Sequence, residues 1–222
     1  MKYANVNGVR TPPNPKLRGI CQLCGSEVIA KCGKYVSWHW SHRSKANCDP
    51  WWETETAWHR EWKERFPESW QEVSLKDALT GERHIADVRT KHGVVVEFQH
   101  SSIHPEEVQS RESFYKRIVW VVDGARSESD RTFFFMGLNK PSIDGYASFE
   151  WIGRGKLFNR WHTTKPVFID FGNEHGFWRV LKFNPSTKRG VVKIVDRSVF
   201  CAELSNGVTD FSNGGGPASH PS

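Results

Sequence analysis

The chain has 222 residues and a mass of 25.6 kDa, which fits one medium-sized domain with a small appendage. Its mean hydropathy of −0.60 indicates a soluble globular protein, and no apolar run approaches the ~20 residues that a membrane-spanning helix needs. The net charge of +6 lies entirely in residues 1–50, which hold eight Lys or Arg against two Asp or Glu. Such a basic segment favours polyanionic partners, although a solubilising surface has the same composition.

The N-terminus and the cysteines indicate the compartment. Residues 1–16 contain no apolar stretch typical of a signal peptide, so we expect a cytoplasmic protein. The five cysteines are an odd number, and two of them form a Cys-x-x-Cys pair. In a chain that is not exported, this pattern favours metal binding over disulfides.

Residues 1–50 are polar, rich in turn residues, and carry the potential metal ligands. Cys21 and Cys24, followed by Gly25, resemble a zinc-knuckle turn. A second group of ligands follows, and the predicted structural zinc site consists of Cys21, Cys24, His42 and Cys48, with His39 as the substitute for either of the last two. Cys32 falls outside both groups and is expected to be a buried thiol. Unliganded cysteines are the alternative, but so polar a segment needs a stabilising metal to fold.

Residues 51–124 alternate between helical and extended patterns. Pro50 and Pro67 are typical of the start and stop of a helix, and Thr80-Gly81 predicts a turn between strands. The pattern predicts a helix over 50–67, strands over 70–74, 84–89 and 93–99, a helix over 105–117 and a strand over 118–122. The last crossover is long enough to make the strands on either side of it parallel.

Beyond Gly124 the pattern is weaker, with strands expected at 167–169 and 191–195. From Asn206 the composition predicts a disordered tail. The predicted fold class is therefore α/β (α+β). The predicted domains are a basic zinc module (1–50), a second domain (51–205) with a core (51–124) and a β-rich extension (125–205), and the tail (206–222).

Two acids in neighbouring strands carry the strongest chemical signal. Asp87 lies in a strand, where an acid is normally disfavoured. Alternation along the next strand places Glu97 and Gln99 on one face with Val95. Two acids on strands joined by a tight turn can converge on one hard cation, so Asp87 and Glu97 are predicted to bind Mg²⁺ or Mn²⁺ and to support phosphodiester cleavage.

The first predicted helix supplies a possible third acid. Helical periodicity places Glu55 and His59 within the apolar stripe of the helix, which Trp51, Trp58, Trp62 and Phe66 define. Charged groups are rare on such a stripe unless they are paired or bind a metal. The alternatives are a salt bridge for Glu55 and a packed, hydrogen-bonded role for His59.

The second predicted helix carries Glu107, Arg111 and Tyr115 on one face. Arg111 could bind a phosphate or steady the acids. A simple Glu107–Arg111 helix pair is an equally good interpretation.

In combination, these motifs resemble the CoiA-like competence protein family, a branch of the PD-(D/E)xK nuclease superfamily. The resemblance spans roughly residues 5–124 and rests on motifs that occur in the family's order. They are Cys21-x-x-Cys24-Gly25, His39-x-x-His42, Glu55…His59…Lys63, Ala86-Asp87-Val88, Glu97-Phe98-Gln99-His100-Ser101, Glu107…Arg111…Tyr115 and Trp120–Asp123. The resemblance implies a restriction-endonuclease-like core (helix, three strands, helix, strand) and a role in handling incoming or recombining DNA.

The chain departs from the superfamily at one position. Gln99 stands where the superfamily usually has a lysine that orients the attacking water, and the CoiA branch has a similar Glu-x-Gln form. A neutral amide can position water but supplies no positive charge. His100 or Arg111 could compensate.

The leading hypothesis is a Mg²⁺-dependent deoxyribonuclease with catalytic residues Glu55, Asp87, Glu97 and Gln99 and accessory residues His59, His100, Arg111 and Tyr115. The alternative is a catalytically silent DNA-binding protein with the same fold. Three converging acids favour the enzyme, because a pure binder does not need them. A zinc-dependent hydrolase is disfavoured, since the cysteine-rich ligand set leaves no open position. Most of the eleven tryptophans are expected in the core, while Trp38 or Trp40 could stack on bases if exposed.

Overall fold

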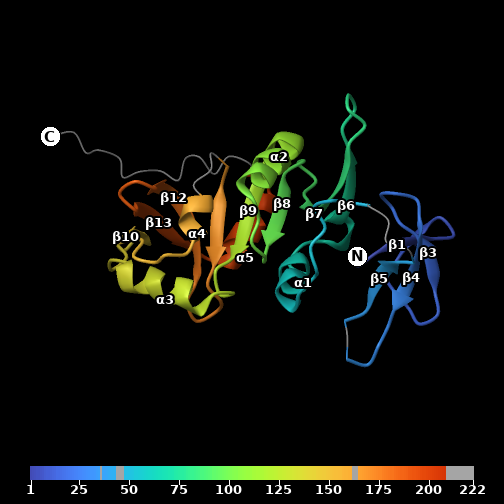
Figure 1. Ribbon diagram of the computed structural model, residues 1–222, viewed down its shortest axis with the longest axis horizontal. Helices are drawn as coiled ribbons and strands as arrows, with labels where there is room; N and C mark the ends of the chain where they lie inside the picture. The colour runs from blue at the N-terminus through green and yellow to red at the C-terminus, as the bar shows by residue number, and fades with distance from the viewer. Residues whose placement is uncertain (36, 44–47, 162–164, 209–222) are drawn as a thin grey trace. The chain divides into compact units, whose positions relative to one another are not determined.

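The computed structural model describes residues 1–35, 37–43, 48–161 and 165–208. The chain divides into two compact units, residues 1–89 and 90–222 (Figure 1). Both contain strands and helices, so the predicted mixed α/β class is confirmed. The predicted boundaries at residues 50 and 205 stay predictions, and most of the predicted tail (209–222) lies outside the described residues.

A small antiparallel sheet opens the first unit. Its order is β2-β1-β3-β4-β5, and its strands are β1 (Ala4–Val6), β2 (Val9–Thr11), β3 (Arg18–Ile20), β4 (Glu27–Lys31) and β5 (His39–His42). The buried core of this sheet includes Val28 and Trp40, whose indole Nε1 donates to Thr11 O at 3.0 Å. Trp40 is therefore a core residue and is not available to stack on bases.

The first helix is shorter than predicted. α1 spans Ala57–Lys63, because a capping box between Thr56 and His59 starts it there and leaves residues 50–56 non-helical. Pro50 is thus not the first helical residue, and Trp51 and Glu55 precede the helix instead of lying on its stripe. Trp62 and Phe66 are buried as expected, while Trp58 is half-buried.

After α1, a short 3₁₀ helix (Glu68–Trp70) leads into the antiparallel hairpin of β6 (Gln71–Lys76) and β7 (Arg83–Arg89). Both strands were predicted. The predicted turn is present as well: Asp77 Oδ1 accepts from the backbone of Leu79 and Thr80, and Gly81 takes a positive φ of 75°.

The second unit is built on strands in the order β10-β13-β12-β11-β9-β8. The strands are β8 (Val95–Gln99), β9 (Ile118–Asp123), β10 (Tyr146–Glu150), β11 (Val167–Asp170), β12 (Phe177–Asn184) and β13 (Arg189–Val195). The crossover helix α2 (Pro105–Tyr115) joins β8 to β9, and the two strands are parallel as predicted. β11 continues the parallel part beside β9, and the remaining neighbours are antiparallel.

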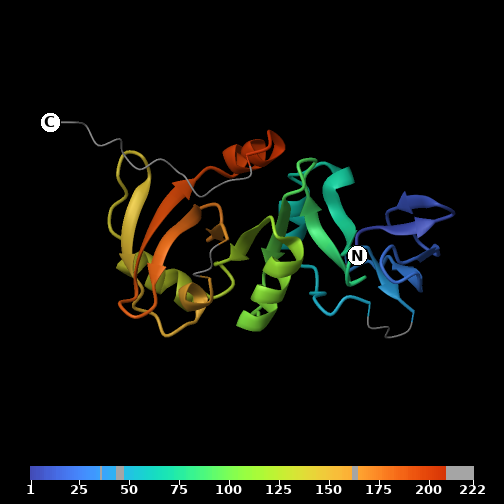
Figure 2. The same cartoon turned by 90° about the horizontal axis from the view of Figure 1, so that it is seen from above.

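Three further helices of the second unit were not predicted. They are α3 (Glu128–Gly137), α4 (Leu157–Arg160) and α5 (Arg197–Ser205). The successive residues Phe177 and Trp178 of β12 point to opposite faces: Trp178 packs on Phe134 of α3 and Phe177 on Phe200 of α5. Helices therefore cover both faces of the sheet (Figure 2), and the expected β-rich extension is a mixed structure.

Burial explains the sequence of β8. All five of its residues are buried, as is usual for a parallel strand covered on both faces, so its polar members Glu97 and Gln99 are also buried. Among the described residues, no helix is long and apolar enough to cross a membrane.

Candidate functional site

The first candidate site is a cluster of three cysteines and one histidine in the first unit. The side-chain ligand atoms of Cys21, Cys24, His42 and Cys48 all lie within 4.8 Å of one another. Cys21 Sγ is 3.5 Å from Cys48 Sγ, and Cys24 Sγ is 3.3 Å from His42 Nε2. All four residues belong to the predicted zinc set, and the cysteines are free thiols.

Local backbone geometry brings the first two cysteines together. Gly25 N donates to Cys21 O at 3.1 Å, and Gly25 takes a positive φ of 73° that closes the turn. Leu23 N donates to Cys21 Sγ at 3.4 Å. The turn after β3 is thus already shaped around the sulfur atoms.

Asp49 positions the last ligand, Cys48. One Asp49 oxygen lies 2.8 Å from Nδ1 of buried His84 and accepts from Trp51 N, and the other accepts from Ile85 N. Burial acts to raise the pKa of Asp49, but these hydrogen bonds hold it below its usual value. The carboxylate therefore fixes the segment after Cys48 against β7.

The donor set suits a soft metal ion such as zinc. Thiolates and imidazole are preferred zinc ligands, and four of them close a tetrahedral site. Burial acts to raise the pKa of Cys24, but hydrogen bonds from Ser26, His42 and Cys48 lower it to about 6. Burial and the neighbouring thiols raise the pKa of Cys48 instead. A metal ion here would be bound by the deprotonated sulfur atoms of these cysteines.

Two other residues of this segment lie elsewhere. His39, the alternate ligand, has its Nδ1 2.8 Å from Ser37 O and is not part of the cluster. Cys32, expected as a buried thiol, is only half-buried, because it lies in the loop that follows β4.

The second candidate site surrounds a buried lysine at the end of α1. The side chain of Lys63 is only 4% exposed. Its Nζ contacts the Glu55 carboxylate and lies 3.1 Å from Glu72 Oε1 and 3.8 Å from Asp87 Oδ1. Burial acts to lower the pKa of Lys63, but the charges of Glu72, Asp87 and Glu55 raise it, so the ammonium stays charged. One cation thus faces three carboxylates. We call these four residues the acid–lysine cluster.

Glu72 was not predicted as a site residue. It lies in β6 with a positive φ of 45°, an unusual conformation for a residue with a Cβ, and it accepts hydrogen bonds from Lys2 N and Tyr3 N. Burial acts to raise its pKa, but the charge of Lys63 leads a set of effects that lower it to about 2. The signal that singled out Asp87, an acid within a strand, applies equally to Glu72.

The other predicted residues of the first unit have distinct roles. Glu55 reaches Lys63 from the extended segment before α1, so the salt-bridge interpretation holds in a more buried form than expected. His59 is buried, with Nδ1 2.9 Å from Thr56 Oγ1 and Nε2 3.0 Å from Glu53 Oε2. These contacts are those of a helix cap, which corresponds to the packed, hydrogen-bonded alternative.

In the second unit, Glu97 is buried against Arg111. Arg111 NH1 is 2.9 Å from Glu97 Oε2, and its NH2 is 2.6 Å from Glu107 Oε1. Burial acts to lower the pKa of Arg111, but Glu97 and Glu107 raise it. Arg111 therefore contacts Glu97 and also forms the helix pair with Glu107, while phosphate binding by Arg111 stays a prediction. Tyr115 is buried on the same helix.

Gln99 is the last residue of β8, and His100 follows it. Gln99 Nε2 donates to Ser101 O at 3.1 Å, and His100 Nδ1 lies 2.7 Å from Asp123 Oδ2 at the end of β9. The other Asp123 oxygen accepts from the backbone of Ala125 and Arg126, so this carboxylate is held rigidly beneath the imidazole. From the sequence, Asp123 was named only as the last residue of the Trp120–Asp123 motif.

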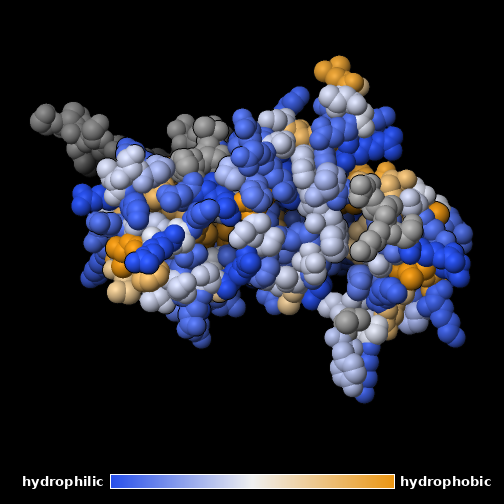
Figure 3. All heavy atoms as spheres, in the orientation of Figure 1, coloured by the Kyte–Doolittle hydropathy of each residue, from blue (hydrophilic) through white to orange (hydrophobic). Residues whose placement is uncertain are grey.

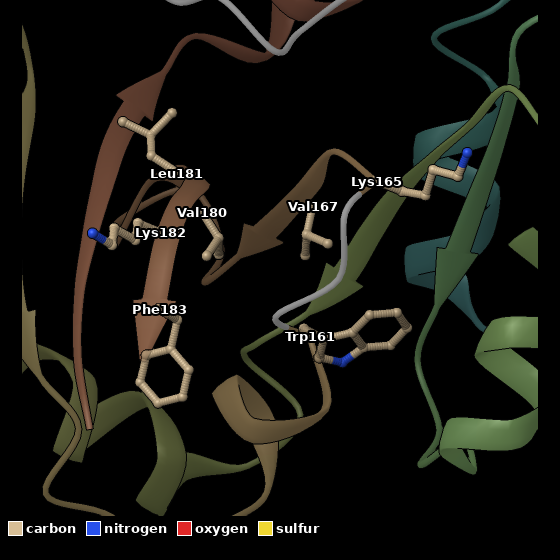
Figure 4. Close-up of a pocket in the computed structure, with 7 residues that line it drawn as sticks. All are labelled: Trp161, Lys165, Val167, Val180, Leu181, Lys182 and Phe183. Atoms are coloured by element: carbon tan, nitrogen blue, oxygen red, sulfur yellow. The ribbon is translucent and has the colours of Figure 1, made fainter. Parts of the chain in front are cut away.

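Asp87 belongs to the first unit and Glu97 to the second, so their convergence on one ion stays a prediction. The second unit also has a depression, which is lined by Trp161, Lys165, Val167, Val180, Leu181, Lys182 and Phe183 (Figure 4). This lining has no carboxylate, imidazole or thiol, and therefore no side chain of the kinds that usually bind a metal ion.

The depressed pKa of Glu72 predicts a pH-dependent contribution to stability. A drop from 4.5 to about 2 corresponds to about 3 kcal/mol, fully present above pH ~4.5 and lost as the pH falls toward 2. We expect Glu72→Gln to lower the free energy of unfolding at pH 7 by an amount of this order. In urea titrations between pH 7 and pH 3, the difference in the free energy of unfolding between wild type and Glu72→Gln should become smaller below pH ~4.5.

Glu68→Gln, which changes an exposed acid nearby, is the control and should leave the free energy of unfolding unchanged at every pH. If the difference in the free energy of unfolding between wild type and Glu72→Gln stayed constant over this pH range, the lowered pKa of Glu72 would be contradicted.

Comparison with protein-family models finds a match to the N-terminal domain of the competence protein CoiA over residues 17–50. All four members of the cysteine and histidine cluster lie in this segment. Neither the search of curated proteins nor the search of solved structures gave a match. Over this segment the chain is therefore similar to the N-terminal domain of CoiA, as its cysteine and histidine pattern indicates.

Proposed function

We propose that this chain is a metal-dependent deoxyribonuclease that acts on DNA in competence or recombination. The acid–lysine cluster carries the proposal. It gathers the carboxylates of Glu55, Glu72 and Asp87 around the ammonium of Lys63, so that three acids lie within reach of one another in a largely buried setting. Such a group of acids is suited to attract a divalent cation.

The donor chemistry fits Mg²⁺ or Mn²⁺, which prefer carboxylate oxygens and keep positions for water and phosphate. Asp87 is the member of the cluster with the most exposed side chain, at 26%, so its carboxylate can reach a ligand. Glu97 would supply the second carboxylate. When bound, the cation would lower the pKa of a water molecule and stabilise the charge that develops at the phosphate.

Within the protein, Lys63 supplies the positive charge that Gln99 lacks. Its ammonium is permanently charged and lies beside Asp87, so it offsets repulsion between this acid and an approaching phosphate. Gln99 would orient water through its amide. Arg111 holds Glu97 in one orientation, and Asp123 holds His100 in one orientation.

The zinc module would bind DNA and remain structural. The four-ligand cluster leaves no open coordination position, and the net charge of the chain resides in residues 1–50. A role in handling incoming DNA is consistent with the match to the N-terminal domain of the competence protein CoiA.

A second candidate is a DNA-binding protein without catalytic activity. The Glu97–Arg111 ion pair favours it, because a carboxylate neutralised by a buried guanidinium is a weaker metal ligand. The two candidates differ in one measurement, the cleavage of DNA in the presence of Mg²⁺ or Mn²⁺.

Purified protein should contain about one zinc per chain, measured by elemental analysis, since the site is closed and tetrahedral. Cys21→Ser should lose the metal and unfold the module, which circular dichroism would register. Cys32→Ser is the matched control, because this thiol lies in the same segment outside the cluster. Wild-type protein that carries no zinc when purified without chelators would refute the assignment.

Asp87→Asn should lower DNA cleavage by about 100-fold or more, since it removes a predicted metal ligand while keeping the size of the side chain. DNA affinity should persist or rise, because an acid that repels phosphate has been neutralised. Asp144→Asn, in an exposed turn, should cut like wild type. If wild-type protein binds DNA but cuts none with either ion, and Asp87→Asn behaves identically, the binding-only candidate is correct.

Lys63→Met should make folding depend on divalent cations. Without the ammonium, three carboxylates repel one another in a largely buried setting. We expect the melting temperature of this variant to fall below that of wild type in EDTA and to recover more with Mg²⁺ than wild type gains. Arg65→Met, at an exposed position just after the helix, is the control. If Lys63→Met and wild type had the same melting temperature in EDTA, the charge of Lys63 would not be stabilising the three acids.

A further inference from the structure

The loop between β4 and β5 exposes two large aromatic side chains. Tyr35 is 90% exposed and Trp38 is 51% exposed, although aromatic residues usually bury most of their surface. The loop extends away from the strands of the five-stranded sheet (Figure 1), and the space-filling view shows polar side chains over this part of the chain (Figure 3).

These aromatics are not required for the core of the sheet. Trp40, two residues after Trp38, fills that role: it is 1% exposed and packs with Ala4, Cys21, Leu23 and Val28. The core is thus complete with a different tryptophan, which leaves Tyr35 and Trp38 free to serve a ligand.

Basic side chains accompany the exposed rings. Lys34 Nζ lies 5.5 Å from the centre of the Tyr35 ring, and Lys31, at the end of β4, is exposed and pairs in register with His39. Arg18 and Arg43 pair with Glu27, whereas Lys31 and Lys34 form no ion pair with any residue that the structure describes. Exposed aromatics beside lysines form the combination that binds stacked bases and phosphates.

The cysteine and histidine cluster anchors this loop. His42 ends β5, and the loop enters β5 at His39, so one short strand separates the metal-binding group from the aromatic residues. A hairpin fixed at one end can present rings at the other end with little loss of conformational entropy on binding.

We propose that Tyr35 and Trp38, with Lys31 and Lys34, form a binding site for single-stranded DNA. The rings would stack on unpaired bases, and the ammonium groups would contact the phosphates on either side. Duplex DNA offers phosphates to the lysines, but its bases are already stacked on one another and offer no free faces to the rings. The site therefore distinguishes single strands from duplexes. It deepens the proposed function by naming the substrate class, and binding can be measured without cleavage.

The test is fluorescence anisotropy in EDTA with labelled oligo(dT) of about 20 nucleotides, longer than the ~4–16 nucleotides of a typical single-strand site. A duplex of the same length is the second probe. Tyr35→Ala and Trp38→Ala should each weaken oligo(dT) binding by about tenfold, as expected for the loss of one stacked base, and leave duplex binding unchanged. Tyr35→Phe should retain the affinity of wild type, because the stacking ring remains.

Lys34→Gln should lower the affinity for both oligo(dT) and the duplex. It should also reduce the slope of log K against log salt by about one, as for one lost phosphate contact. Leu79→Ala is the matched control, since Leu79 is 96% exposed at the tip of the β6–β7 turn and should not affect either probe.

Undiminished oligo(dT) binding by both alanine variants would overturn the inference, as would equal losses on single strands and duplexes. Cleavage measured separately keeps the two proposals apart. A wild-type enzyme that cuts DNA while both variants bind normally would refute this site alone. Variants that lose single-strand binding in a protein without nuclease activity would support the site and refute the nuclease.

Discussion

The buried ammonium of Lys63 is the interaction on which the first unit depends. It joins α1 to the β6–β7 hairpin through Glu72 and Asp87, and to the preceding extended segment through Glu55. Glu72 also accepts from the backbone of Lys2 and Tyr3, so the start of the chain is attached to the same group. Ion pairs so buried add little net stability over an apolar core but are costly to break.

The cysteine and histidine cluster provides the second constraint. The five-stranded sheet has strands of three to five residues and a small core. So small a core buries too little apolar surface to fold readily without a bound metal or a cross-link. Cys21 and Cys24 come from the turn after β3, His42 from β5, and Cys48 from the segment that Asp49 holds against β7. A metal ion at this point would join three separate segments, and it would stabilise the hairpin that carries Tyr35 and Trp38.

The buried acids of the second unit have different kinds of partners from those of the first unit. Glu97 is matched by Arg111, His100 by Asp123, and Asp170 by Arg197. Arg111 also pairs with Glu107, so it serves two acids, whereas Lys63 lies beside three.

Local patterns in the sequence were enough to determine the strands β6 to β9, the crossover helix and the members of the cysteine and histidine cluster, because periodicity, turn residues and ligand spacing act over short distances. The start of α1 was misjudged, since the Thr56–His59 capping box outweighed the proline at position 50. The helices α3 and α5 were missed although Ser127 and Asp196 cap them. Their apolar side chains are explained only by packing against the two faces of the sheet, which the sequence does not show. Only the tertiary structure decided that Lys63 is the shared partner of three acids, that Glu72 is one of them, and that Trp40 is core while Trp38 is exposed. Those outcomes depend on which distant segments pack together, and burial, unlike spacing, is a property of the assembled fold.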